Sequence, residues 1–374
     1  MKWFFGKHPG GKMSSCSSLG HKALGAALLA GFLVFPSAPL AQGKPGPAAE
    51  IYMYRGADRD KRVLEGARKE RQAVVYTSLN LKDSVPITQA SEKKYGVKIE
   101  LWRSSSERVL QRALAEARAG RFSVDAFELN GPELEALYRE GLLEEFYSPQ
   151  FANLPPSAFP KHRHYAADRF NFFTIAYNTN LVKPEEVPDS YEDLAHPRWV
   201  GRIGIEASDT DWFGSIVKAM GEEKGLALFR KLAQMKPQIR TGHTLIAELV
   251  AAGEIPLAAT IYNHNAERLL VNGAPIKWKA LQPTFGRPNA VAVAKRAERP
   301  HAALLFADFM LSIEGQTLIK QRNRVPASPK VDTNLNKFPY EMIDPVVVLD
   351  EAEKWEGLWS ELFLKGQKVK KEAE

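Results

Sequence analysis

Cysteine is nearly absent from this chain of 374 residues, which contains only Cys16. That cysteine lies before an apolar run at residues 23–35, inside a segment that we expect to be removed from the mature protein. The remaining chain would then have no disulfide, no thiolate metal ligand and no cysteine nucleophile. This excludes the disulfide-rich secreted class and every enzyme that depends on a cysteine.

Long apolar runs are also absent, because residues 23–35 fall short of the roughly 20 residues that span a membrane. A histidine and a lysine precede this run, and a small-residue stretch at 36–43 follows it. Basic residues, an apolar run and small residues, in that order, are typical of a secretory signal peptide. We therefore predict a signal peptide over residues 1–43, cleavage near Ala41 or Gly43, a periplasmic location and no membrane insertion.

A strong charge of one sign is missing once this segment is set aside. Residues 1–43 contain four lysines and no acidic residue, so their removal lowers the net charge from +7 to +3. No basic stripe with interleaved aromatics occurs in the rest of the chain, and we expect no nucleic-acid partner. The sequence also lacks a phosphate-binding glycine loop, a zinc-protease helix motif and a Ser-His-Asp order, so we expect no enzyme.

What the chain does contain is a regular alternation of strands and helices. Such alternation predicts an α/β fold with mostly parallel sheets flanked by helices. The expected strands cover residues 73–78, 97–102, 124–129, 170–177, 202–206, 238–240, 257–262 and 289–294. The aromatic strand at 170–177 would link the first half to the second, residues 147–165 would form a loop, and residues 340–363 would be helical.

The stretch from Gly201 to Met220 contains the clearest candidate for a binding site. A short strand is followed by Ser208, Asp209, Thr210 and Asp211 where a helix begins. Unpaired backbone N–H groups and the positive end of the helix dipole suit an anion at such a position. An ordinary capped helix explains the same residues, and capping also explains the two aspartates without catalysis. This stretch alone leaves both interpretations open.

Several short phrases resemble one family. Tyr76-Thr-Ser78, Trp102-Arg-Ser-Ser-Ser106 and the stretch 175–182 resemble bacterial ABC-transporter solute-binding proteins of the ferric-iron and phosphonate type. Residues 197–203, 273–275 and 302–316 are similar to that family too, and the resemblance covers residues 71–330. It implies two α/β lobes joined by hinge strands, with ligand held in the cleft between them. The expected parts are a signal peptide (1–43), an N-terminal extension (44–70), lobe 1 (71–175 plus 288–322) and lobe 2 (176–287 plus 323–374).

The resemblance implies the periplasmic substrate-binding component of an ABC importer, with a membrane permease as partner. We expect a monomer, no cofactor, no resident metal and a small, anionic organic solute. Hydroxyl groups and backbone N–H groups at the positions that the family uses would bind its oxygens. The expected ligand contacts are Ser78, Asn80, Arg103, Ser104, Ser105, Asp209, Thr210, Trp212, Thr241, Tyr262, Asn263 and His264.

The sequence departs from the iron binders of this family at one point. They place two adjacent tyrosines at a strand end, and that pair would fall at Asn263 and His264 here. Tyr262 stands one residue early and has no tyrosine neighbour. Asparagine is a poor ligand for a hard ferric ion and histidine a borderline one. Ferric iron therefore remains the alternative solute, and a secreted enzyme on the same fold is the least favoured reading.

Overall fold

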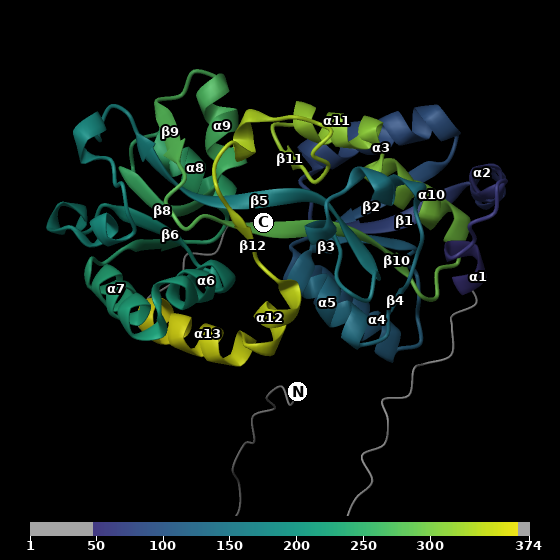
Figure 1. Cartoon of the computed structure of the whole chain (residues 1–374), viewed down its shortest axis with the longest axis horizontal. Coiled ribbons are helices and arrows are strands. Elements are labelled where there is room, and N and C mark those ends of the chain that lie inside the picture. The colour runs from purple at the N-terminus through teal and green to yellow at the C-terminus, as the bar shows by residue number, and fades with distance from the viewer. Residues whose placement is uncertain (1–47, 366–374) are drawn as a thin grey trace, which may run out of the picture. The chain divides into compact units, whose positions relative to one another are not determined.

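The computed structural model describes residues 48–365 of the chain (Figure 1). The chain divides into two units, residues 1–42 and residues 43–374, and the described residues all belong to the second. The predicted signal peptide lies outside the described residues. Everything below concerns the second unit.

Two sets of elements build this unit. Its strands are β1 (Gln72–Thr77), β2 (Lys98–Arg103), β3 (Ala126–Asn130), β4 (Leu143–Glu144), β5 (Tyr165–Asn178), β6 (Ile203–Glu206), β7 (Gln238–Arg240), β8 (Leu257–Tyr262), β9 (Ile276–Lys279), β10 (Phe285–Ala294), β11 (Val325–Pro326) and β12 (Glu341–Met342). Its helices are α1 (Ala49–Tyr52), α2 (Arg59–Glu70), α3 (Leu81–Tyr95), α4 (Ser106–Arg118), α5 (Gly131–Arg139), α6 (Thr210–Met220), α7 (Glu222–Gln234), α8 (His243–Ala251), α9 (Asn263–Val271), α10 (Pro300–Leu311), α11 (Ile313–Gln321), α12 (Pro345–Asp350) and α13 (Ala352–Trp359).

One long strand, β5, belongs to two sheets at once. The strand order is β2-β1-β3-β10-β5-β8-β6-β7, with parallel pairs β1–β2, β1–β3, β6–β8 and β6–β7. The first half of β5 pairs antiparallel with β10, and its second half pairs with β8 and β9. We call the part built on the first half lobe 1 and the part built on the second half lobe 2. The predicted α/β fold with two lobes is confirmed.

Local signals explain most element boundaries. The side chain of Asn80 accepts a hydrogen bond from the backbone N–H of Lys82 at 3.0 Å and so caps α3. Gly96 follows that helix with φ of 72°, a left-handed conformation that glycine adopts without steric cost. Ser105 caps α4 in the same way, by accepting from the N–H of Arg108. Polar residues at the strand ends therefore start the helices, as the sequence predicts.

The core of lobe 2 is aromatic. Trp212, Phe213, Phe229 and Trp359 are all buried to 1% exposure or less, and their rings contact one another at centroid distances of 4.7–6.5 Å. Edge-to-face aromatic pairs add to the stabilisation that burial of their area gives. Trp212 was expected to contact ligand, but the structure buries its side chain in this core, so we leave it out of the proposed site.

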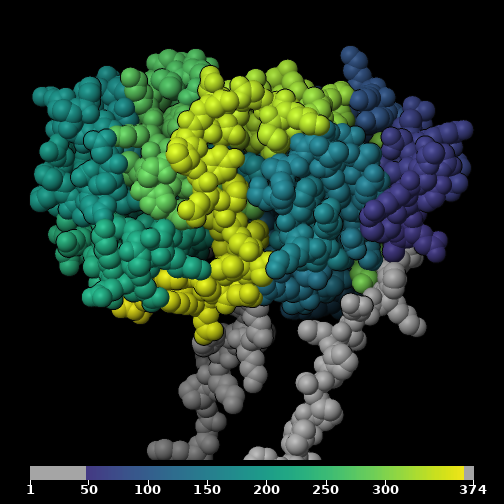
Figure 2. All heavy atoms as spheres, viewed as in Figure 1, coloured from purple at the N-terminus to yellow at the C-terminus, as the bar shows by residue number. Residues whose placement is uncertain are grey.

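The C-terminal segment, expected to be helical over residues 340–363, is helical over most of that range, in α12, α13 and a π-helical turn at Ser360–Leu364. It differs at Glu341–Met342, which form β12 on β10, and β11 on β5 precedes it. Helix α12 packs on α5 of lobe 1 and α13 packs on α6 of lobe 2, so the segment lies across the junction of the two lobes (Figure 2). Because β11 pairs within the lobe 1 sheet, residues 325–326 belong there by hydrogen bonding. The predicted lobe limits otherwise stay a prediction.

Other differences concern length. The strand expected at 289–294 begins earlier, at Phe285, and the loop expected up to residue 165 ends where β5 begins. Among residues 48–365 no single helix has the length and apolarity needed to cross a membrane. The bent pair α10 and α11, with 62° between them, passes that test only when taken together, and most of α10 is buried in the lobe 1 core.

Candidate functional site

The carboxylate of Glu206 accepts hydrogen bonds from two turns at the edge of the lobe 2 sheet where β6 and β7 end. Oε2 of Glu206 accepts hydrogen bonds from the backbone N–H and the hydroxyl of Ser208, at 2.6 Å and 2.8 Å. Its Oε1 accepts from the backbone N–H of Gly242 at 2.9 Å. Burial, reinforced by the nearby charge of Asp209, raises the pKa of Glu206. Two N–H groups at an edge expected to bind anions are thus already occupied by the protein itself.

Asp209, at the start of α6, has a fully buried side chain. Its Oδ2 accepts a hydrogen bond from the hydroxyl of Thr260 at 2.6 Å. Its Oδ1 lies 3.2 Å from Nε2 of His243 and 3.7 Å from Nη2 of Arg287, but accepts no hydrogen bond from any described residue. Asp209 therefore keeps one acceptor oxygen available.

Arg287, on β10, is a positively charged residue beside Asp209 and Asp211, and its N–H groups donate hydrogen bonds to other side chains of the protein. Its Nε donates to Oδ2 of Asp211 at 2.5 Å, its Nη2 donates to Oδ1 of the same carboxylate, and its Nη1 donates to the hydroxyl of Tyr262 at 2.5 Å. Such a two-point pair of guanidinium and carboxylate is strong and geometrically specific. Oδ1 of Asp211 also accepts a hydrogen bond from the backbone N–H of Trp212. Arg287 therefore serves the protein's own carboxylate rather than a ligand.

Tyr262 links two histidines. Its ring centroid lies 3.8 Å from that of His243 and 5.6 Å from that of His264. Burial raises the pKa of the Tyr262 phenol well above its ordinary value of 10, and Arg287 opposes this only in part. The phenol is therefore protonated at neutral pH.

His264 connects the two lobes through an arginine. Nη1 of Arg324 donates to Nε2 of His264 at 2.6 Å, and Nη2 of Arg324 donates to Oδ2 of Asp83, on α3 of lobe 1, at 2.6 Å. Burial, together with the charge of Arg324, lowers the pKa of His264 well below 6.5. The imidazole is therefore neutral, with its proton on Nδ1. Nδ1 has no partner among the residues that the structure describes.

The facing edge of lobe 1 is built around Glu128, at the end of β3. The hydroxyl of Thr77 and Nη1 of Arg169 both donate to this carboxylate, and the hydroxyl of Thr77 accepts from the backbone N–H of Leu79 at 2.9 Å. Nη1 of Arg169 also contacts Asp168, at 3.2 Å. Burial raises the pKa of Asp168 to about 8 against the opposing charge of Arg169. The cluster is then close to neutral at pH 7, with Glu128 and Arg169 in balance.

Glu133, near the start of α5, faces the junction from lobe 1. Its Oε2 is buried and has no hydrogen-bond partner among residues 48–365. Burial raises the pKa of Glu133 to about 8, the charge of Glu107 adds to this, and Arg287 opposes it. The effects of Arg287 and Asp211 on Glu133 place this lobe 1 carboxyl near the ion pair that lines lobe 2.

The expected ligand positions fall into three groups. Asp209, Tyr262 and His264 come together with Glu206, Asp211, His243 and Arg287. In lobe 1 the backbone N–H groups of Ser78 and Ser104 are bonded to strand carbonyls, while Asn80 and Ser105 cap helices and Arg103 and Ser105 are exposed. Thr210 lines a surface cavity beside α6, and Thr241 is exposed. Asn263 is fully buried and donates to the carbonyl of Leu335, so we leave it out of the proposed site.

Sequence reasoning gave Arg287 and His243 too little weight and missed Arg324 and Asp83. Gly286 and Pro288 flank Arg287, and residues of that kind interrupt a strand pattern, so the first half of β10 was not predicted. Asp83 and Arg324 are 241 residues apart, and no local pattern connects them. A signal was present for His243, because it directly follows a glycine turn at the start of a helix.

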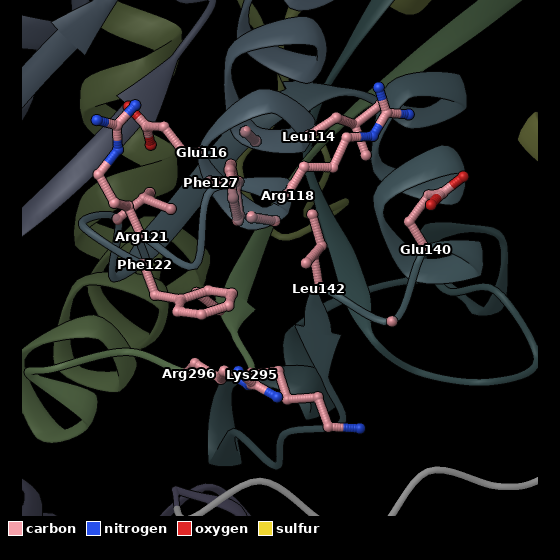
Figure 3. Close-up of a pocket in the computed structure, with 15 residues that line it drawn as sticks. Leu114, Glu116, Arg118, Arg121, Phe122, Phe127, Glu140, Leu142, Lys295 and Arg296 are labelled. Carbon is pink, nitrogen blue, oxygen red and sulfur yellow. The ribbon is translucent and has the colours of Figure 1, made fainter.

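Of two larger cavities among the described residues, one lies away from this junction and the other borders it. One, of about 360 Å³, is shown in Figure 3, where Arg118, Arg121, Lys295 and Arg296 surround an apolar floor that includes Phe122. It lies beyond the end of β10, about 23 Å from Arg287 at roughly 3.3 Å per residue. The other, of about 410 Å³, lies between α6 and the C-terminal segment and is lined in part by Asp211.

Comparison with known proteins shows the family to which the chain belongs. Residues 129–353 match the model of a family described as bacterial extracellular solute-binding protein. This match covers more than half of the chain, so the chain belongs to that family. This description agrees with the solute-binding class that the resemblance implies, and it names extracellular proteins.

Individual relatives are more distant. Iron uptake protein A1 of Synechocystis is 26% identical over 297 residues, which cover 72% of this chain and 79% of that protein. Iron-bound HitA from Pseudomonas aeruginosa superposes with a TM-score of 0.70 at 20% identity, covering 78% of this chain and 99% of HitA. AfuA from Actinobacillus pleuropneumoniae, solved with fructose-6-phosphate, also gives 0.70 at 20% identity, over 79% and 99%. At these identities the solved structures establish the two-lobed fold alone.

Proposed function

We propose that this protein is the periplasmic solute-binding component of an ABC importer, which captures its solute between the lobes and delivers it to a membrane permease. The proposal is supported by the family match and by the strand β5, which both sheets share. A shared strand lets two lobes rotate about a narrow connection, as in hinge-bent binding proteins. A monomer remains our expectation.

We propose iron, in its ferric form, as the solute. This reverses the order of our sequence expectations, in which an organic anion came first. The observation that carries the proposal is that carboxylate oxygens, rather than free N–H donors, lie at the lobe 2 edge. Glu206 and Asp211 already accept hydrogen bonds from the backbone N–H groups of Ser208, Gly242 and Trp212. The buried Oδ1 of Asp209 accepts no hydrogen bond from any residue that the structure describes. Such an edge suits a cation.

The charges point the same way. Asp209 and Asp211 lie beside a single guanidinium, that of Arg287, whose donors are engaged, and Glu206 adds a third carboxylate next to Asp209. A small anion would meet three carboxylates there, whereas a metal ion would offset their mutual repulsion. The iron named in Iron uptake protein A1 and in HitA supports the same choice.

The test measures retained iron. Protein stripped with a chelator is incubated with ferric citrate and desalted, and the iron is counted by mass spectrometry. We expect one iron per chain and a raised unfolding temperature, because a ligand that binds only the folded state stabilises it. Citrate without iron is the matched control. Stabilisation by citrate alone, with no iron retained, would contradict the proposal.

An organic anion is the second candidate, favoured by lobe 1. Arg103 and the hydroxyl of Ser105 are exposed beside the start of α4, and Arg103 forms no ion pair with another described residue. AfuA, which shares the fold, was solved with fructose-6-phosphate. The same stabilisation assay with fructose-6-phosphate and with inorganic phosphate separates the two candidates. Stabilisation by either phosphate, without iron, would make the anion the solute.

A further inference from the structure

We propose that Glu206, Asp209 and His243 are the protein's iron ligands and take the place of the adjacent tyrosines that this sequence lacks. The proposal rests on the proposed function for the identity of the ion, and it goes further by naming the donor atoms. One carboxylate oxygen from each acid and one imidazole nitrogen lie within 4.8 Å of one another. Two donors on opposite sides of one metal ion are at most about 4.4 Å apart, at bond lengths of roughly 2.0–2.2 Å, so the three side chains would move closer together around the ion.

The fold brings the three side chains together from separate elements. Glu206 ends β6, Asp209 precedes α6 and His243 begins α8. Strands β6 and β7 are parallel, with Glu206 opposite Arg240, so the turns that follow them lie at the same edge of the sheet. All three ligands come from lobe 2, which means that the ion would bind to one lobe before the other closes over it.

An independent sign of a missing ligand is an unsatisfied buried acceptor. The side chain of Asp209 is 0% exposed, yet its Oδ1 accepts no hydrogen bond from any residue among 48–365. That oxygen is directed at His243, whose Nε2 is 3.2 Å away and whose own Nδ1 also lacks a partner. Buried polar atoms without partners are uncommon in folded proteins, and a bound ion is one explanation of such an atom.

Neighbouring groups hold the ligands in place. The hydroxyl of Thr260 donates to the other oxygen of Asp209, and the N–H groups of Ser208 and Gly242 fix both oxygens of Glu206. Partners of this kind orient metal ligands and are worth 10- to 100-fold in affinity in known sites. Oε1 of Glu206, which accepts from Gly242, keeps one lone pair for the ion, and Oδ1 of Asp209 accepts no hydrogen bond from the described residues.

Tyr262 has another part in this arrangement. Its hydroxyl accepts a hydrogen bond from Arg287, and its ring packs against His243. With its hydroxyl bonded to Arg287 and its ring against the imidazole, Tyr262 positions His243 and is not one of the three ligands. The proposal therefore predicts an iron complex without the strong visible absorption that phenolate ligands give.

The experiment compares ligand variants with a control on the same helix. Iron retention and affinity, by competition with citrate, are measured for the wild type, Asp209→Asn, His243→Gln and Glu206→Gln. Glu248→Gln is the control, because Glu248 is exposed on α8 outside the set. We expect at least a tenfold weaker affinity in each ligand variant and no change in the control. X-ray absorption at the iron edge should show imidazole scattering in the wild type that is lost in His243→Gln.

Two results would overturn the ligand set, and they differ from failure of the proposed function. Unchanged iron affinity in all three folded variants, or an intense visible band that Tyr262→Phe removes, would place the iron elsewhere. If the wild type retains no iron at all, the proposed function fails first. Circular dichroism of each variant excludes loss of folding, and His243→Gln, at a partly exposed position, keeps the test open if Asp209→Asn does not fold.

Discussion

The sheet edges of the two lobes use their charges differently. In lobe 1 the carboxylate of Glu128 is matched by Arg169 and by the hydroxyl of Thr77, and Asp83 is matched by Arg324. In lobe 2 Asp209 and Asp211 share one arginine, Glu206 adds a third carboxylate beside them, and Oδ1 of Asp209 accepts no hydrogen bond from the described residues. If the solute is a cation, as proposed, the lobe 2 edge would contact it first and lobe 1 would close over it.

The largest expected effect breaks the balance in lobe 1. Arg169→Met should lower the free energy of unfolding by about 3–5 kcal/mol, because it leaves the buried Glu128 without its cation. Denaturant unfolding measures the loss. Lys295→Met, at a partly exposed position on the same lobe, is the control and should change the unfolding free energy by less than about 0.5 kcal/mol. Equal stability of Arg169→Met and wild type would show that this edge is not held by charge.

A second prediction concerns pH and Glu133. The folded protein holds a proton on Glu133 up to about pH 8, whereas the unfolded chain releases it near its ordinary pKa of 4.5. The folded state therefore binds more protons between these values, and stability falls as pH rises through that window. From pH 5.5 to 7.5 this group would cost at most about 2.7 kcal/mol, at 1.36 kcal/mol per pH unit.

Glu133→Gln removes this titrating group and should flatten that part of the pH profile. Unfolding free energies of variant and wild type at pH 5.5 and pH 7.5 give the difference directly. Glu140→Gln, at an exposed position that follows α5, serves as the control. An identical slope in Glu133→Gln and wild type would mean that the carboxyl is solvated.

Tyr262→Phe should have a smaller effect. It removes the acceptor of one Arg287 donor, which costs about 1 kcal/mol of unfolding free energy, the usual value of a hydrogen bond. The ring that packs against His243 remains, so iron affinity should fall less than in the three ligand variants. Thermal unfolding and iron competition on the same samples check both statements. A loss of iron affinity as large as that of His243→Gln would move the phenol into the ligand set.

The smallest expected effect lies in the link from the C-terminal segment to lobe 1. Nη1 of Arg139 and Oδ1 of Asp350 pair at 2.6 Å, but the side chains are 37% and 57% exposed. An exposed pair contributes about 0.2–1 kcal/mol, so Asp350→Asn should change affinity for solute by less than about fivefold. High salt should weaken the wild type by a similar amount. A change of tenfold or more would make this pair a latch between the lobes.

How much of this could be predicted from the sequence depends on how local each signal is. Strands β7 and β8 match their predicted ranges, because the pattern of apolar residues and the helix caps depend only on neighbouring residues. The short strands β11 and β12 were not predicted, since two residues carry no periodicity and pair only through distant partners. Trp212 is a residue whose place, core or ligand, only packing could decide.

The site follows the same rule. Asp209 and Tyr262 were expected because they end or begin elements that the sequence marks clearly. Arg287 pairs with Asp211 across 76 residues and Arg324 pairs with Asp83 across 241, and no sequence pattern reports pairs so far apart. The prediction of an anion failed to anticipate that Glu206 and Asp211 would bind the N–H groups first. A backbone N–H group at a turn can bind a ligand only if no carboxylate of the protein already accepts its hydrogen bond.

The late position of β10 in the chain has a consequence for how the protein reaches its destination. Its Asn289 pairs with Asn130 across 159 residues, so the sheet of lobe 1 cannot close until most of the chain has been synthesised. Contacts this far apart in sequence make folding slow, because a long loop must close before they form. A growing chain with β1, β2 and β3 but without β10 stays open during that time. Slow folding of this kind would suit the export that residues 1–43 predict, because a chain that is still unfolded can pass through a membrane channel.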